Sequence, residues 1–169
     1  MNKEFAVNFL KKYQPMPSDN ILSEELINQY DLVRKYFLNN PDEECIPLLL
    51  NSFGEYDGMG VYQLLEDVLL KFKHDKVVVH LKQSLKNKYN GVRYWSAQIA
   101  SSFPDEVLIN PLEELLYSPQ QDIRLAAISA LSSIDDGKVI KIIVNHLNNE
   151  KDSDAVEFIN MVLEDLSNK

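Results

Sequence analysis

Apolar positions recur along the chain every three or four residues, which is the period of a helix. In residues 92–103 the apolar or small positions are Val92, Ser96, Ile99, Ala100 and Phe103. This spacing of three or four residues is typical of an α-helix that buries one side, whereas a half-buried strand would alternate at every second residue. The alanines near residue 127 also favour a helix and let a neighbouring helix approach closely. We therefore predict an all-α protein that needs no β-strand.

The helical pattern repeats every 31 residues. Val61, Val92 and Ile123 begin three equivalent segments, and a fourth copy, slipped by one residue, occupies 154–166. A second helical pattern lies between these copies and recurs at the same interval: Val77, Leu81 and Leu85; Leu108, Leu112 and Leu116; Val139, Ile143 and Leu147. Each unit thus contains two helices, and a fixed period of this length indicates an α-solenoid in which stacking buries the apolar faces.

Short polar segments are predicted to separate these helices. His74-Asp75, Pro104-Asp105 and residues 135–137 are interpreted as turns. A stronger signal begins at Ser118, which is predicted to cap a helix whose first residue is Pro119. Gln121 then occupies the position of the glutamine in a capping box.

The first 59 residues follow the repeat less regularly. We expect helices at residues 4–13, 21–38 and 41–53. The predicted organisation is a single domain, 1–169, with an N-terminal cap helix in 1–17, a degenerate repeat in 21–59 and regular repeats in 60–166.

The stretch from Asp105 to Leu131 resembles a HEAT repeat. It combines a helix containing Pro111-Leu112, an acidic turn, an Ile123-Arg124 pair and spaced alanines on a second helix. Residues 90–93 match the turn and the Val-Arg pair. The resemblance implies a right-handed α-α superhelix, a HEAT-like solenoid of about five helix pairs. It also implies that Arg93 and Arg124 tie neighbouring repeats through turn carbonyls and acids.

Composition and charge narrow the function classes. The 169 residues are 45% apolar and 25% charged, as in an ordinary globular protein, and the net charge is -9. This charge opposes binding to phosphate backbones and anionic membranes unless the cations are concentrated in one place. Cys45 is the one cysteine, so no internal disulfide can form, which favours a reducing compartment. Because no apolar run is long enough to span a bilayer, we expect a cytoplasmic protein with no membrane association.

The residues that carry chemistry form no recognisable catalytic or metal-binding pattern. No histidine is followed by glutamate. His74 falls in a predicted turn, and His80 and His146 lie on first helices of different predicted units, so no metal site is expected. Cys45 lies among apolar neighbours and is interpreted as a buried, inert thiol. The glycine-rich segment 54–60 lacks the Gly-Lys-Ser/Thr of a phosphate loop and the spacing of a calcium loop, so we predict a connecting loop. The sequence thus predicts no enzymatic activity and no cofactor.

The second helix of each unit carries the candidate binding surface. In HEAT-like solenoids these helices line the concave face, and their outward positions combine aromatic residues and methionine with acidic residues, as in a protein-binding patch. The predicted partner-binding residues are Gln63, Asp67, Tyr94, Trp95, Gln98, Leu125, Ser129, Glu157, Phe158 and Met161. Trp95 and Phe158 fit a place in the core equally well. Tyr56 and Met59, at the tip of the glycine-rich loop, are further candidates for partner contact.

These features predict a non-enzymatic protein that binds another protein and is a monomer alone. The chain resembles small HEAT-like bacterial immunity proteins, which neutralise a cognate toxin by direct binding. An acidic inhibitor suits a basic toxin such as a nuclease, because opposite charges speed association. The alternative is a HEAT-like protein that binds nucleic acid or a damaged base. Residues 51–100 carry a net charge of +2, but their lysines are interpreted as lying on convex helices, which makes nucleic acid the less favoured partner.

Overall fold

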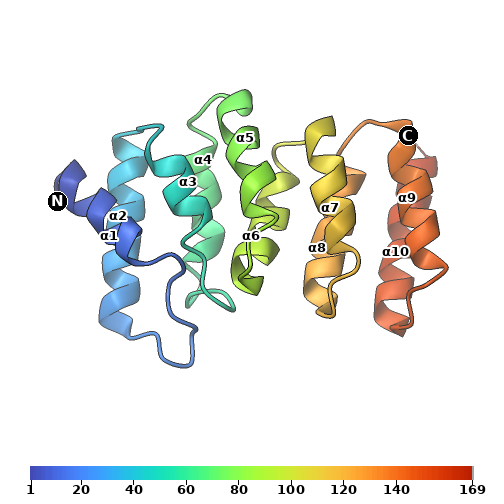
Figure 1. Cartoon of the computed structure of the whole chain (residues 1–169), viewed down its shortest axis with the longest axis horizontal. Coiled ribbons are helices and arrows are strands. Elements are labelled where there is room, and N and C mark those ends of the chain that lie inside the picture. The colour runs from blue at the N-terminus through green and yellow to red at the C-terminus, as the bar shows by residue number, and fades with distance from the viewer. Residues whose placement is uncertain (169) are drawn as a thin grey trace. The chain divides into compact units, whose positions relative to one another are not determined.

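The computed structural model describes residues 1–168, and helices are the regular structure throughout this range. Ten α-helices and two short 3-10 helices follow one another (Figure 1): α1 (Lys3–Lys12), α2 (Glu24–Asn39), α3 (Cys45–Leu50), η1 (Tyr62–Leu65), α4 (Glu66–Leu69), α5 (His74–Ser84), α6 (Asn90–Ala100), η2 (Glu106–Leu108), α7 (Ile109–Leu115), α8 (Gln121–Ser132), α9 (Gly137–Leu147) and α10 (Ser153–Ser167). No strand occurs in the described range, so the all-α prediction is confirmed.

The chain divides into two compact units, Met1–Trp95 and Ser96–Lys169, with the division inside α6. In the first unit α1 packs on α2 and α3, α3 packs on α5, and α2 packs on α4. The largest side chains with no exposed surface, Tyr30, Phe37, Phe53 and Tyr62, lie in this unit. Its core is therefore rich in aromatic rings.

The second unit is built around α8, which contacts α7, α9 and α10. Ala126, Ala127 and Ala130 of this helix are buried. Such small side chains allow neighbouring helix backbones to approach closely, as the spaced alanines indicate.

Side-chain caps set the start of several helices. Ser23 accepts a hydrogen bond from the backbone N–H of Leu26, so α2 begins at Glu24 and not at residue 21 as expected. Asn2, Asp136 and Asp152 cap α1, α9 and α10 in the same way. Each cap satisfies an amide that has no partner within the helix.

Other predicted boundaries are also wrong. The helix expected over 41–53 is confined to α3, and the repeat segment that begins at Val61 is reduced to η1 and α4, which ends at Leu69. The capping box at Ser118 does not form, because its hydroxyl accepts from the N–H of Gln120 and α8 begins only at Gln121. His74 and Asp75, predicted as a turn, are the first residues of α5.

Candidate functional site

The loop of residues 54–60 joins α3 to η1 and presents two large apolar side chains to solvent. Tyr56 is 64% exposed and Met59 is 52% exposed. The segment was predicted as a loop, and the structure confirms this. Exposed aromatic and methionine side chains at one place are typical of a surface that contacts another protein.

The backbone of this loop is held in an uncommon conformation. Tyr56 has a φ of 69° and Met59 a φ of 53°, in the left-handed region that residues with a Cβ rarely adopt. Such residues cost about 1–3 kcal/mol each and persist where the surroundings fix them. Gly58 and Gly60 also have positive φ, which glycine tolerates without this cost.

Three contacts fix the loop. The indole Nε1 of Trp95 donates a 2.7 Å hydrogen bond to the carbonyl oxygen of Tyr56. The carboxylate of Asp19 accepts a 3.2 Å hydrogen bond from the N–H of Gly58. At the start of α6, Gly91 lies so close that a Cβ there would be 1.8 Å from the carbonyl oxygen of Gly54. The loop is therefore held from α6 and from the segment that follows α1.

The Trp95 ring packs against a cluster of aromatic side chains. Its ring stacks on Phe53 at a centroid distance of 5.7 Å and meets the edge of Tyr62 at 6.0 Å. Tyr62 also packs edge-on against Tyr30 at 5.7 Å. Burial raises the pKa of Tyr62 to about 12. These rings form a rigid apolar base under the loop.

The loop itself carries acidic side chains. Residues 36–70 contain seven acidic residues and no lysine or arginine, but three of the seven form ion pairs with lysines from elsewhere in the chain. Glu55 and Asp57 flank Tyr56 and are exposed. Burial and the neighbouring Asp57 raise the pKa of Asp19, while its bond from Gly58 acts in the opposite direction. The local charge therefore favours contact with a cationic surface.

The structure brings part of the predicted binding set to this loop. Trp95 is half-buried, and its N–H is already used to hold Tyr56. Tyr94 is half-buried and meets the Trp95 ring edge-on at 5.3 Å. Gln63 and Asp67 are exposed, and the Gln63 amide donates to the carbonyl of Gly60. Trp95 thus joins the core cluster to the candidate surface, which sequence reasoning had left open.

The remaining predicted residues lie in the second unit. Gln98 on α6 and Glu157 and Met161 on α10 are exposed. Leu125 and Ser129 on α8 are half-buried, as is Phe158 on α10, which is neither core nor fully accessible. Their role in binding stays a prediction.

Sequence reasoning found Tyr56 and Met59 as loop-tip candidates but missed how they are held. The hydrogen bond between Trp95 and Tyr56 joins residues that are 39 positions apart, and no local sequence pattern predicts it. The three glycines in 54–60 were the available signal, because such a density of glycine indicates positive φ angles.

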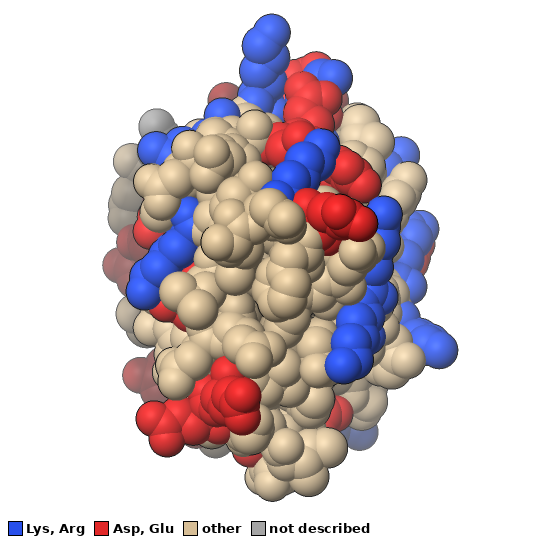
Figure 2. Space-filling model, turned by 90° about the vertical axis from the view of Figure 1, so that its left-hand side faces the viewer, with Lys and Arg blue, Asp and Glu red and all other residues tan. Residues whose placement is uncertain are grey.

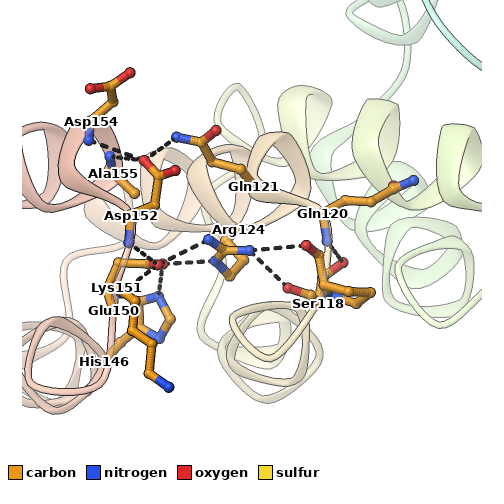
Figure 3. A network of polar contacts seen from close by, with 11 residues as sticks. Ser118, Gln120, Gln121, Arg124, His146, Glu150, Lys151, Asp152, Asp154 and Ala155 are labelled. Atoms are coloured by element: carbon orange, nitrogen blue, oxygen red, sulfur yellow. Dashed lines mark hydrogen bonds and ion pairs between the residues drawn. The ribbon is translucent and has the colours of Figure 1, made fainter.

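A network around Arg124 lies in the second unit (Figure 3). Its guanidinium forms a bidentate pair with Glu150, at 2.7 and 3.0 Å, and donates to the carbonyl of Ser118 at 3.0 Å. His146 Nε2 lies 3.2 Å from the Glu150 carboxylate. These bonds connect the turn before α8 to the segment between α9 and α10. The predicted use of Arg124, contact with turn carbonyls and an acid, is confirmed.

The remaining titratable candidates from the sequence are Cys45 and the three histidines. Cys45 is buried, and burial raises the pKa of its thiol to about 12, so it is a poor nucleophile near pH 7. Within residues 1–168 no group of three or more His, Cys, Asp or Glu side chains lies in a geometry that can hold a metal ion. His74 and His80 lie on α5, and His146 belongs to the Arg124 network.

A shallow groove lies on the outer side of α1 and α2. Figure 2 shows this face: uncharged side chains cover its middle, and charged ones lie around them. The groove has a volume of about 570 Å³ and is lined by Met1, Phe5, Leu32, Lys35, Tyr36, Asn39 and Asn40. Lys35 at its margin already pairs with Asp31 at 2.6 Å. The groove is thus mainly apolar.

No known family model matches the sequence. No curated protein matches it either. Among residues 1–168, no helix combines the length and the apolar character that crossing a membrane requires.

Proposed function

We propose that this chain is a HEAT-like α-solenoid protein that binds another protein without catalysing a reaction. In its specific form, the proposal is an immunity protein that neutralises a basic toxin by direct binding. Support for the solenoid comes from the 31-residue repeat and from the succession of helix pairs, of which α7–α8 and α9–α10 follow the repeat. The cytoplasm is the proposed location.

The observation that carries the proposal is the loop with Tyr56 and Met59. Both side chains are exposed, while the backbone beneath them is held by Trp95 and Asp19. A pre-ordered loop loses little conformational entropy on binding, so more of the contact energy appears as affinity. Tyrosine is also among the residues enriched at the energetic centres of interfaces.

Charge supports a basic partner. The net charge is -9, and the exposed acids Glu55 and Asp57 flank Tyr56 in the loop. Complementary charge raises the association rate and disfavours acidic partners. A small basic toxin has the charge that complements this chain, whereas duplex DNA is anionic and is repelled by it.

The test begins with capture of the tagged chain from its native host, followed by titration of the recovered partner. Tyr56→Ala should weaken binding by about 2 kcal/mol or more, the usual threshold for an interface anchor. Tyr117→Ala is the matched control, because Tyr117 is an exposed tyrosine outside the loop. Both variants should retain the wild-type melting temperature.

The outcomes separate the alternatives. Recovery of a basic protein whose affinity falls only in Tyr56→Ala supports the proposal. Recovery of nucleic acid, with binding that weakens steeply as salt rises, supports the alternative function instead. Equal binding by Tyr56→Ala and wild type contradicts the assignment of the loop.

A further inference from the structure

Helices α9 and α10 bury few of their apolar side chains. Only Val139 and Ile143 of the eleven residues in α9 are buried, and only Ala155 and Ile159 of the fifteen in α10. By contrast, α8 buries six of twelve. A helix with such a narrow buried stripe leaves apolar surface to be covered by something else.

The uncovered side chains form rows along these two helices. On α9, Ile140 and Val144 are 43% and 40% exposed, and Leu147 continues the row one turn later. On α10, Val156 and Leu163 are seven residues apart, which places them on one side of the helix, and both are half-buried. Figure 1 shows α9 and α10 side by side at the edge of the second unit, with α7 and α8 on their other side.

Charge is divided between the two helices. Residues 137–147 contain two lysines and no acidic residue, whereas residues 153–167 contain four acidic residues and no lysine or arginine. Lys141 directly follows Ile140, so it borders the apolar row of α9. Glu157 and Glu164 directly follow Val156 and Leu163 and border the row of α10.

We infer that this α9–α10 face binds the same face of a second copy of the chain. A two-fold axis parallel to the helices places α9 of one copy on α10 of the other, and the reverse. Each cationic margin then meets an acidic margin, while the apolar rows cover one another. This self-complementary charge identifies the occupant as a second copy.

The inference is independent of the Tyr56 loop, and it replaces the expectation of a monomer, which rested on sequence pattern alone. Two helices offer a small interface, so we expect a dissociation constant in the micromolar range, about 1–100 µM. The apolar rows supply most of the burial. The charges select the pairing of α9 with α10 over α9 with α9.

The experiment is sedimentation equilibrium of the full chain from about 1 to 500 µM, with charge-swap variants. Lys141→Glu and Glu164→Lys should each raise the dimer dissociation constant about tenfold, because each places like charges across the interface. The double variant restores opposite charges and should return the constant to within about threefold of wild type. Lys82→Glu, an exposed position on α5, is the matched control and should dimerise normally.

Two results would overturn the inference. One is a wild-type protein that stays monomeric at every concentration. The other is a dimer that tolerates Lys141→Glu as well as it tolerates Lys82→Glu. Because all substituted side chains are exposed, thermal melts should show that every variant is folded, and rescue by the double variant excludes a general loss of structure.

Discussion

Trp95 and Tyr56 lie 39 positions apart and are joined by a 2.7 Å hydrogen bond from the indole Nε1 to the carbonyl oxygen. The same indole stacks on buried Phe53. One side chain therefore connects the core of the first unit to a loop whose backbone has positive φ at Tyr56. The strain in the loop persists because this bond and the bond to Asp19 hold it.

Trp95→Phe should separate these two roles. Phenylalanine keeps most of the stacking on Phe53 but cannot donate to Tyr56. We expect a loss of about 1 kcal/mol in the free energy of unfolding, the net value of one hydrogen bond. Faster proteolytic cleavage within 54–60 should accompany it, because the loop loses an anchor.

Denaturant unfolding followed by circular dichroism and limited proteolysis measure the two effects of Trp95→Phe. Trp95→Ala, which also removes the stacked ring, should lose about 3 kcal/mol. Equal cleavage of wild type and Trp95→Phe would show that the indole N–H does not hold the loop.

Arg124→Ala should be among the most destabilising changes in the second unit. It would leave the Glu150 carboxylate, whose side chain is only 5% exposed, without its cation. Breaking one side of a buried pair costs about 3–5 kcal/mol, mainly because the remaining charge is uncompensated. Arg124→Ala combined with Glu150→Gln should recover part of this loss, since no buried charge then remains. Chemical denaturation of wild type, the two single variants and the double variant gives the coupling energy between Arg124 and Glu150. If the two single losses simply added up in the double variant, the predicted coupling would be absent.

The same pair predicts how stability depends on acid. Arg124, with backbone donors from Lys151 and Asp152, holds the pKa of Glu150 at about 2, against an ordinary value of 4.5. Because the folded pKa is the lower one, the pair stabilises the fold fully above about pH 5 and loses this stabilisation as pH falls toward 2. The amount is about 3 kcal/mol, from the size of the shift.

Glu150→Gln isolates this contribution. The difference in unfolding free energy between wild type and Glu150→Gln should shrink by about 3 kcal/mol as the pH falls from 5 to 2. Glu106→Gln, at an exposed position, is the control and should show no such change. A pH-independent difference would mean that Arg124 does not lower this pKa.

The stability of alanine variants can show which second-unit residues of the predicted binding set contribute to packing. Phe158 is half-buried and should cost about 1–3 kcal/mol when replaced by alanine, because packed surface is lost. Met161 is exposed, so Met161→Ala should stay within about 0.5 kcal/mol of wild type. Thermal melts of both variants measure the contribution to packing, and titration of the captured partner measures the contribution to binding. A Phe158→Ala variant that is fully stable yet loses binding would make Phe158 an interface anchor.

The helical repeat was predictable because burial of one helix face repeats at a fixed period in the sequence. The period 31 located α5 to α10 to within a few residues, and Arg124 lies where the resemblance implied. The region before residue 72 was less predictable, since η1 and α4 together form only a short helical segment that begins as a 3-10 helix, where a regular repeat was expected. The contacts that shape loop 54–60 are long-range, and a single sequence does not encode the pairing of Trp95 with Tyr56 in any local pattern.

Two glycines near helix starts provide a matched test of how closely α6 approaches the loop. Gly91 is the second residue of α6, and a Cβ there would be 1.8 Å from the Gly54 carbonyl oxygen. Gly137 is the first residue of α9, and a Cβ there would meet nothing within 4 Å. The same substitution therefore has opposite expected effects at the two positions.

Gly91→Ala should destabilise the protein by about 3 kcal/mol, because the obstructing atom belongs to the backbone and cannot move aside cheaply. Gly137→Ala should stabilise it by about 0.5–1 kcal/mol, because alanine loses less backbone entropy on entering a helix. Unfolding in urea measures both. Since Trp95 is the one tryptophan, its emission reports the loop directly and should shift in Gly91→Ala but not in Gly137→Ala. If Gly91→Ala matched wild type in stability and emission, the close contact between α6 and the loop would be wrong, and with it the explanation of why the loop holds its strained backbone.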